Sequence, residues 1–588
     1  MGKYLRTILL STFIVFFLMG GCSSSSDSDI GFIPLTGNVE EATPPIRETI
    51  YGEAEGIEAD ANTWAWLGIP YAKPPVGELR WKAPQDPEPW GGARECTEFC
   101  SECTQQAMGQ TWVPLDYIVG SEDCLYLNIW RPQSDETALP VYFWIHGGSN
   151  NFGTVKDYNG AGIAGKLNMV VVVIQYRLGP LGWFTHPSLR SGENAYEDSG
   201  NFGTLDTIKA LEWVQNNIAF FGGDPSNVTI AGESAGAHNV TNLLISPLGA
   251  GLFHRAISES GGMSTVSVDT GVKMANDTIE MLLVADGTAA NKFWAALYRI
   301  TMTDAEIEEY LRGKSAEDII NAQIDETTGS MDTHSAYEDG AVVPGSVISA
   351  IESGDYNKVP IVLGSNEYEV KSFLPLVGHV IGIKTSSNHT WFDLYKVLDP
   401  DDPLTLDDVM PPTHHDKDLY EACGYYGSRN WKAKYVDSIA RKLKEKQDDV
   451  YAYLFKWGGP GSGPEPFDFI YGAGHAMEIP FFWGSDESLF GYSFTEGNRP
   501  GRQALQDAMM TYMAQFARTG DPNEVDLPVW EQWSNNEGEP KAIVFDATTT
   551  EANIGMMSEE VTEEGVLEEV KKLDLFTRFV VGLLLLVF

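Results

Sequence analysis

Short apolar runs recur along the chain and alternate with segments of helical spacing. The two clearest runs are Val141–Ile145 and Val170–Ile174, which contain no charged residue. Four further runs follow at Val228–Ala231, Ala256–Ser258, Val359–Leu363 and Val450–Phe455. Because near-continuous apolar runs are typical of strands buried on both faces, the pattern predicts a sheet that helices cover on each side.

A helical pattern separates the second of these strands from the third. Its apolar residues fall at helical spacing, at Leu205, Ile208, Leu211, Val214 and Ile218. Gly222 and Gly223 follow and indicate the end of the helix. Strand, helix and strand in this order predict a parallel sheet and an α/β fold.

Composition bounds the number of domains and the partners. The chain has 588 residues, of which 43% are hydrophobic, and a formal net charge of −44. No Pro/Gly/Ser-rich linker interrupts residues 46–575, so we expect one large domain there. The negative charge disfavours nucleic acids and anionic membrane surfaces as partners and otherwise predicts a solvated acidic surface.

The first residues have the pattern of a targeting segment. Lys3 and Arg6 precede a short apolar run, Ile8–Met19, and two glycines then precede Cys22. The stretch "LMGGC" resembles a bacterial lipoprotein box, which implies cleavage before Cys22 and lipidation of its thiol. The alternative is a plain secretory signal with an incidental cysteine.

This resemblance divides the N-terminal region in two. Residues 1–21 are expected to be a lipoprotein signal peptide, and residues 22–45, which include "SSSSDSD", a flexible tether. We therefore expect an exported protein that the lipid on Cys22 holds at a bacterial membrane, in the periplasm or at the cell surface.

The C-terminal end is also apolar. Residues 579–588 form a ten-residue apolar run, which is too short for an ordinary transmembrane helix. We expect residues 576–588 to be a separate apolar tail. The pattern leaves open whether this tail packs as a terminal helix or touches the membrane.

Five cysteines remain after Cys22, at Cys96, Cys100, Cys103, Cys124 and Cys423. The first three have the spacing C-x3-C-x2-C, which can hold an iron–sulfur cluster. The oxidising compartment that export implies favours disulfides instead. An odd count leaves one thiol unpaired.

A candidate nucleophile lies directly after the third apolar run. Residues 232–236, "GESAG", match G-x-S-x-G, and the helix-like "AGAHNVTNLLI" begins at Ala235. A strand, a sharp turn and a helix form a nucleophile elbow, which would present the hydroxyl of Ser234 at the strand tip. The alternative is an ordinary glycine-rich turn with a bystander serine.

A serine hydroxyl needs a base, an acid that orients the base, and donors for the oxyanion. The amide of Ala235 is one candidate donor. The loop after Val141–Ile145, which reads His146-Gly147-Gly148-Ser149, is the candidate source of the others.

Four blocks of sequence resemble the type-B carboxylesterases, the group of the α/β-hydrolase fold that includes the cholinesterases. The blocks are "GIPYAKPPVGELRW" at 68–81, "SEDCLYLNIW" at 121–130, residues 201–236 around the candidate elbow, and "GHAMEIPFFWG" at 474–484. The resemblance implies a central, mostly parallel sheet flanked by helices, with large loop and helical insertions around an active-site gorge. It also implies hydrolysis of a small-molecule carboxylic ester through an acyl-enzyme, without a cofactor or a metal.

The resemblance further implies a Ser–Glu–His triad with Ser234 as nucleophile. The chain order of this family places the base after the acid, which leaves five candidates: His379, His389, His414, His415 and His475. Only His475 lies in a block that resembles the family.

The family pattern also assigns supporting residues. Gly148, Ser149 and Ala235 would donate the oxyanion hydrogen bonds, with Ser149 in place of the usual third glycine. Glu233 matches a glutamate that tunes the site electrostatically; a satisfied buried carboxylate is the alternative. Cys103 and Cys124 match the first disulfide of the family, and Cys96 with Cys100 would form a small second one.

The acid lies in "GSNEYEV", residues 364–370, just after a predicted strand. Before the resemblance is considered, Glu367 and Glu369 are equal candidates. The family pattern Gly-x-Asn-x-Asp-Glu-Gly places the catalytic glutamate at Glu369. Here Tyr368 replaces the aspartate and Val370 the second glycine, so Glu369 must reach the imidazole past a bulkier neighbour.

Two other functions fit the same residues. A non-catalytic binding or adhesion protein on the same fold is one, because fold does not imply function. Hydrolysis of amides by the same triad is the other.

Overall fold

The computed structural model describes residues 45–109, 114–262, 265–325, 329, 331–380, 383–399, 402–412, 415–487 and 493–586. Pro44–Phe588 forms one unit by its internal contacts. The predicted signal peptide, Cys22 and the tether up to residue 44 lie outside the described residues, as does the candidate base His414.

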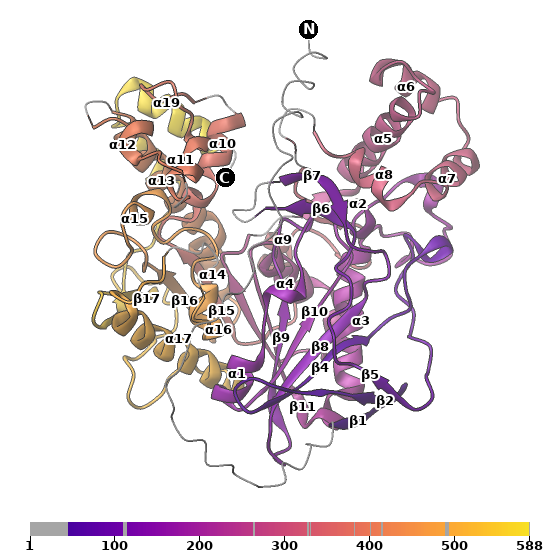
Figure 1. The fold of residues 1–588 in the computed structure, drawn as a ribbon, viewed down its shortest axis with the longest axis horizontal. Helices are drawn as coiled ribbons and strands as arrows, with labels where there is room; N and C mark the ends of the chain where they lie inside the picture. The colour runs from indigo at the N-terminus through magenta and orange to yellow at the C-terminus, as the bar shows by residue number, and fades with distance from the viewer. Residues whose placement is uncertain are drawn as a thin grey trace, which may run out of the picture. The chain divides into compact units, whose positions relative to one another are not determined.

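The described part of the chain contains an 11-stranded central sheet (Figure 1). In spatial order its strands are β18 (Ala552–Met557), β17 (Ala542–Ala547), β16 (Val450–Phe455), β15 (Ile361–Asn366), β12 (Arg255–Glu259), β11 (Gly223–Glu233), β9 (Leu139–Ile145), β10 (Val170–Ile174), β8 (Tyr126–Pro132), β4 (Thr63–Pro70) and β3 (Ile57–Ala59). All pairs from β17 to β10 are parallel, whereas the pairs at the two edges are antiparallel. The predicted mostly parallel sheet is confirmed.

Strand β9 shows why the apolar runs are continuous. Its seven residues are all buried, and successive side chains enter different cores. Val141, Phe143 and Ile145 belong to one hydrophobic cluster, whereas Tyr142 and Trp144 belong to the other. Because side chains alternate across a strand, a sheet with a core on each face needs apolar residues at every position.

Helices supply the other half of each core. On one face lie α3 (Phe202–Asn217) and α4 (Ala235–Ile245), and on the other lie α1 (Ala161–Leu167) and α17 (Arg499–Thr519). The predicted helix between the second and third strands is α3. A short 3₁₀ turn, Ile218–Phe221, extends it before the chain reverses at Gly222, whose φ is 79°.

Two groups of helices are inserted between strands. After β12 come α5 (Val268–Ala285), α6 (Lys292–Arg299), α7 (Asp304–Arg312), α8 (Ala316–Asn321) and α9 (Val347–Ser353). Between β15 and β16 come α10 (Leu374–Val380), α11 (Leu394–Val397), α12 (Leu406–Val409), α13 (Asp416–Lys432), a π-helical turn (Ala433–Asp437) and α14 (Ser438–Lys444). In Figure 1, α5–α8 lie at the upper right and α10–α13 at the upper left.

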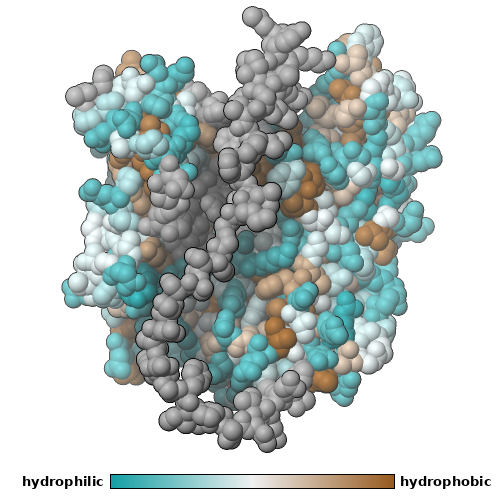
Figure 2. Space-filling view, viewed as in Figure 1, coloured by the Kyte–Doolittle hydropathy of each residue, from teal (hydrophilic) through white to brown (hydrophobic). Residues whose placement is uncertain are grey.

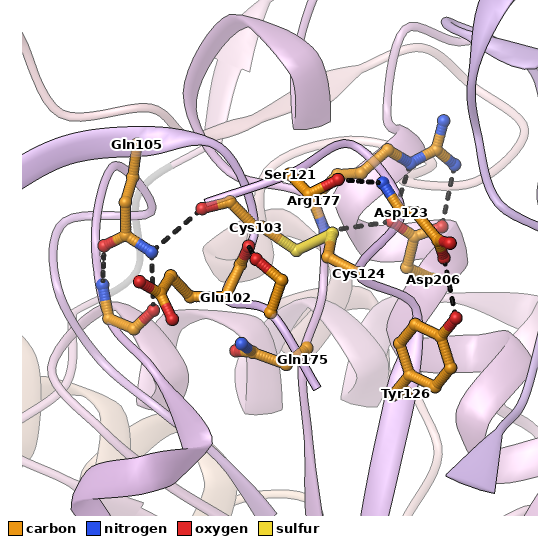
Figure 3. The surroundings of a disulfide bond; sticks show 12 residues. Glu102, Cys103, Gln105, Ser121, Asp123, Cys124, Tyr126, Gln175, Arg177 and Asp206 are labelled. Carbon is orange, nitrogen blue, oxygen red and sulfur yellow. Dashed lines mark hydrogen bonds and ion pairs between the residues drawn. A yellow bond between two sulfur atoms is a disulfide. The ribbon is translucent and has the colours of Figure 1, made fainter. Parts of the chain in front are cut away.

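A disulfide joins Cys103 to Cys124 (Figure 3), as the family resemblance implies. It closes the segment that contains β6 (Gln105–Met108) and β7 (Pro114–Val119). The side-chain amide of Gln105 donates hydrogen bonds to the carbonyls of Cys103 and Gly153, at 3.0 and 2.9 Å. This loop therefore lies against the segment that follows the predicted oxyanion loop.

The expected second disulfide is absent, because Cys96 and Cys100 are free thiols in the structure, as is Cys423. Cys96 is held by its backbone between Glu55 and Leu67, whereas the Sγ of Cys100 faces the carbonyl of Gly68 at 3.9 Å. The two cysteines thus contact different residues and are not bonded to each other. The prediction of a disulfide between them is wrong.

The C-terminal apolar run is part of this unit. After α18 (Glu563–Val570), helix α19 (Leu575–Leu584) buries Val580, Val581 and Leu584 and packs on α13. Phe576 and Phe579 of α19 are exposed. Among the described residues, no helix combines the length and apolar character needed to cross a bilayer. The non-grey surface in Figure 2 is mostly hydrophilic, in keeping with the acidic composition.

Candidate active site

Ser234 lies in a sharp turn between β11 and α4. Its backbone has φ 56° and ψ −122°, a conformation that residues other than glycine rarely adopt. The carbonyl of Glu259 on the neighbouring strand accepts a hydrogen bond from the Ser234 amide at 2.9 Å and holds the turn. A Cβ at Gly236 would lie 2.0 Å from the carbonyl oxygen of Ile145, so only glycine lets α4 start this close to β9. The local geometry is that of the predicted elbow.

Glu369 follows β15 in a short 3₁₀ helix, Glu369–Ser372, and is fully buried. One carboxylate oxygen, Oε1, accepts a hydrogen bond from the Asn366 amide at 2.7 Å. The other, Oε2, lies 2.6 Å from Nδ1 of His475. The bulkier Val370 therefore does not prevent this contact.

Glu367 has a different environment from Glu369. Its carboxylate lies 2.7 Å from the ammonium of Lys456, and both side chains are partly exposed. The two candidate acids are thus separated by geometry, since only Glu369 contacts a histidine.

His475 lies in the loop between α15 (Phe467–Ile470) and α16 (Ile479–Trp483), with only 2% of its surface exposed. The rings of Phe373 and Trp431 flank its imidazole, with centroid distances of 4.9 and 5.4 Å. Its second nitrogen, Nε2, lies 3.0 Å from Oε1 of Glu233. These two atoms are close enough for an ion pair but are not aligned for a hydrogen bond.

The charges around His475 favour the imidazolium. Burial by itself disfavours the charged ring, but the negative charges of Glu233 and Glu369, the hydrogen bond to Glu369, and the charge of Glu478 outweigh burial. Together they raise the pKa of His475 to about 9.

Beside Glu369 and His475 lies a cluster of three more buried carboxyl groups, those of Glu233, Glu478 and Glu259. Burial raises the pKa of Glu233 well above its usual range; the nearby imidazolium opposes the shift, and Glu478 and Glu369 add to it. Burial and the charge of Glu369 raise the pKa of Glu478 to about 7. Burial also raises the pKa of Glu259 well above its usual range, and neither of its oxygens has a hydrogen-bond partner among the described residues. Like charges this close disfavour full ionisation of the carboxyl cluster, whereas negative charge on Glu233 is favoured by the imidazolium of His475 beside it.

The predicted oxyanion loop follows β9 and turns sharply. Ser149 and Asn150 both have positive φ values, 55° and 58°, each at a cost on the order of 1 kcal/mol. Side-chain hydrogen bonds hold the turn, because Asn150 donates to the carbonyl of His334 at 2.8 Å and accepts from Asn239 at 2.9 Å. Among the hydrogen bonds of the described residues, none is donated by the amides of Gly148, Ser149 or Ala235.

His146 stiffens this loop. Its Nδ1 lies 2.9 Å from the carbonyl oxygen of Gly147, and its ring stacks on Tyr176 with a centroid distance of 4.5 Å. Burial lowers the pKa of His146 to about 4, so the ring is neutral at physiological pH.

A cavity of about 610 Å³ brings these elements together. Its lining includes Glu233, Ser234 and His475 together with three residues of the loop after β9, Gly147, Gly148 and Ser149. Apolar and aromatic side chains complete it, among them Met108, Val119, Phe152, Tyr158, Phe373 and Ile479. Its volume and its mixed lining are those of a small-molecule site.

The other residues considered from sequence lie elsewhere. His389 pairs with Asp393 at 3.4 Å, and His415 is 99% exposed beside Asp418. The aromatic residues Trp183 and Phe184 do not line this cavity and are buried in the core, at 1% and 2% exposure. Within the described ranges, no three His, Cys, Asp or Glu side chains are grouped to bind a metal ion.

Sequence reasoning missed Glu478 and its partners. Glu478 accepts hydrogen bonds from Ser260 Oγ, at 2.5 Å, and from the side-chain amide of Asn366, which also donates to the carbonyl of Gly474 at 2.7 Å. Glu478 thereby ties the end of β15 to the loop of His475. The signal was present, since Glu478 lies three residues after His475 in the block that resembles the family.

The model of the carboxylesterase family matches residues 43–562. The chain belongs to the carboxylesterase family. The liver carboxylesterase of Sus scrofa is 33% identical over 540 residues, which are 85% of this chain and 89% of that protein. The human cocaine esterase is 33% identical over 541 residues, 85% of this chain and 88% of that protein.

A solved bacterial carboxylesterase has the same architecture. The enzyme of Geobacillus stearothermophilus, at pH 6.2, aligns with a TM-score of 0.66 and 31% identity, over 87% of this chain and 97% of the other. The fold is thus the α/β-hydrolase fold, and the protein is a carboxylic ester hydrolase.

The two carboxylates of "GSNEYEV" lead to opposite predictions for this carboxylesterase. Glu369→Gln replaces the charge that orients and stabilises the imidazolium, so kcat should fall by about 10²–10⁴-fold. Glu367→Gln alters only a partly exposed ion pair with Lys456 and should change kcat less than about threefold. Steady-state hydrolysis of a nitrophenyl ester by both variants is the measurement, and the reverse ranking would move the acid by two residues.

The pH dependence of kcat/KM should shift when Glu233 loses its charge. A histidine base acts when its imidazole is neutral, so with His475 in that role activity should rise with pH through its pKa in the free enzyme. Glu233→Gln removes a negative charge that favours the imidazolium, which lowers that pKa and moves the acid limb to lower pH. Glu478→Gln should move it in the same direction by less. A limb that stays in place or moves to higher pH in Glu233→Gln would contradict the assignment.

Proposed function

We propose that this carboxylesterase is an exported serine hydrolase that cleaves carboxylic esters through an acyl-enzyme on Ser234. The observation that carries the proposal is the 2.6 Å contact of Glu369 with Nδ1 of His475, whose imidazole lines the same cavity as Ser234. A nucleophile, a base and an acid that orients the base thus converge on one space.

Acylation begins when Oγ of Ser234 attacks the ester carbonyl carbon and its proton passes to Nε2 of His475. The carbonyl oxygen becomes an oxyanion in a tetrahedral intermediate. When the intermediate collapses, the bond to the alcohol oxygen breaks and Nε2 returns the proton to that oxygen. The alcohol leaves, and the acyl group stays on Ser234.

The oxyanion needs donors that are already oriented. The amides of Gly148, Ser149 and Ala235 suit this role because they lie on the loop and the helix start that flank Ser234. Because Ser149 already has the backbone conformation that glycine would adopt, its side chain does not remove the amide from this set.

Deacylation reverses the proton path with water. His475 takes a proton from a water molecule, the hydroxide attacks the acyl carbonyl, and Ser234 regains its proton as the carboxylic acid leaves. The Glu369 carboxylate stabilises the imidazolium that forms in both halves of the reaction.

The substrate class follows from the cavity. Phe152, Tyr158 and Phe373 offer apolar and aromatic surface, and the lining also includes the charged residues Glu102, Lys156 and Asp157. Such a lining suits an uncharged ester with apolar acyl and alcohol parts.

A fluorophosphonate probe and short-chain nitrophenyl esters test the activity. The wild-type protein should hydrolyse the esters and take up one probe on Ser234, because the probe mimics the acylation step. Ser234→Ala should lose labelling and at least about 10³-fold of the turnover. Ser353→Ala, which changes an exposed serine at the end of α9, is the matched control and should behave as wild type. A wild-type protein that neither labels nor turns over would instead be a non-catalytic member of the family.

We also propose that Cys22 is lipidated after removal of residues 1–21 and that the lipid holds the enzyme at a bacterial membrane. The support is the sequence alone: a charged start, a short apolar run and small residues directly before the cysteine. More than one acyl chain on the same residue gives stable membrane binding, whereas a single chain does not.

Metabolic labelling with a radioactive fatty acid in a bacterial host tests the anchor. The wild-type chain should carry the label and sediment with membranes, because the acyl chains partition into lipid. Cys22→Ala should lose both properties, whereas Cys100→Ala, which changes a half-buried thiol, should keep them. A labelled Cys22→Ala chain would overturn the assignment of the lipidated residue.

A further inference from the structure

A buried lysine follows the proposed catalytic acid by two residues. Lys371 is 1% exposed, and its ammonium donates to Oε1 of Glu421 at 2.7 Å and to the carbonyl of Phe469 at 2.9 Å. It belongs to the same short 3₁₀ helix as Glu369. Neither its burial nor these partners is used in the mechanism above.

Three aromatic rings enclose the Lys371 ammonium. Its Nζ lies 4.2 Å from the ring centroid of Tyr368, 5.4 Å from that of Phe469 and 6.0 Å from that of Tyr420. A cation over such ring faces is attracted by their negative potential, and more strongly where water is excluded. The lysine stem runs along α13, where a Cβ at Gly424 would lie only 2.8 Å from its Cγ.

One hydrogen-bond partner of Lys371 lies in the segment that leads to His475, and the other lies on α13. Phe469 lies in α15, directly before the loop of His475, whereas Glu421 lies on α13. Two neighbouring hydrogen bonds link the same segments. The Tyr368 amide donates to the carbonyl of Ala473 at 2.9 Å, and the Tyr420 hydroxyl donates to the carbonyl of Ile470 at 2.8 Å. The ammonium therefore ties the turn of Glu369 to the chain that leads into His475.

Stability alone is a poor reason for a cation at this place. Removing an ammonium from water costs several kcal/mol, and well-packed apolar residues often replace a buried ion pair without loss of stability. A hydrogen-bonded cation does fix direction, since its donors must meet a carboxylate and a carbonyl at defined positions. The buried ammonium of Lys371 is thus suited to fixing the 3₁₀ helix of Glu369 relative to α15, which leads into the His475 loop.

We propose that Lys371 is a positioning residue that sets the alignment of Glu369 with His475. This role rests on the proposed function, because it acts through the acid–base pair of the triad. It also gives a physical role to Tyr368, which stands where the family pattern has aspartate and supplies the ring nearest to the ammonium.

A double-mutant cycle separates positioning from a general structural role. Lys371→Met keeps the stem and removes the ammonium, so kcat for a nitrophenyl ester should fall about 10–100-fold with KM little changed, because the acid–base pair loses alignment. In the Glu369→Gln background the same change should cost less than about threefold, since the contact it aligns is already impaired.

Lys541→Met is the matched control. Lys541 is also 1% exposed, and its ammonium donates to the carbonyls of Ser534 and Asn536 (2.8 Å for the latter), before β17. Its loss should change kcat less than about twofold and by the same factor in both backgrounds, whatever it does to thermal stability.

Two results would overturn the proposal: an unchanged kcat in Lys371→Met, or the same fold loss with and without Glu369. If Lys371→Met does not fold, Tyr368→Leu removes the nearest ring, and a kcat loss that again depends on Glu369 is required. Failure of the proposed function is distinguishable, because the wild-type protein itself would then lack esterase turnover and probe labelling.

Discussion

The structure of the site depends on one hydrogen bond, that between Oε2 of Glu369 and Nδ1 of His475. It fixes the orientation of the imidazole and stabilises its charged form inside a buried pocket, where an isolated cation would be costly. The opposite nitrogen lies beside Glu233, and His475 lines the same cavity as Ser234. In the mechanism that we propose, loss of this contact would leave the serine and the loop amides without an oriented base.

The sheet is what brings these distant residues together. Ser234 follows β11 and Glu369 follows β15, with only β12 between these two parallel strands, so both side chains emerge at the same edge of the sheet. Cores on both faces hold the strands in register. The side chains of Asn366, at the end of β15, and Ser372, in the following 3₁₀ helix, donate hydrogen bonds to carbonyls of the His475 loop and so hold that loop in place. The precision of the site therefore comes from the most buried part of the fold.

Much of this arrangement was predictable from sequence, because it leaves local signals. The two-sided burial of β9 and β10 appears as unbroken apolar runs, and the elbow at Ser234 needs glycines at fixed positions. The choice of Glu369 over Glu367 came from the family pattern, since both follow the same strand. Contacts between distant segments leave no such signal. The three rings around the Lys371 ammonium come from three separate segments of the chain. Proximity in sequence was also misleading, since Cys96 and Cys100 lie four residues apart and do not form a disulfide.

Proton NMR tests the central contact most directly. A proton held between Nδ1 of His475 and a carboxylate should resonate far downfield at pH values below the pKa of His475, where the ring is an imidazolium. We predict this resonance in the wild-type enzyme and in Glu367→Gln, and its loss in Glu369→Gln. A downfield resonance that persists in Glu369→Gln, or that disappears in Glu367→Gln, would contradict the account.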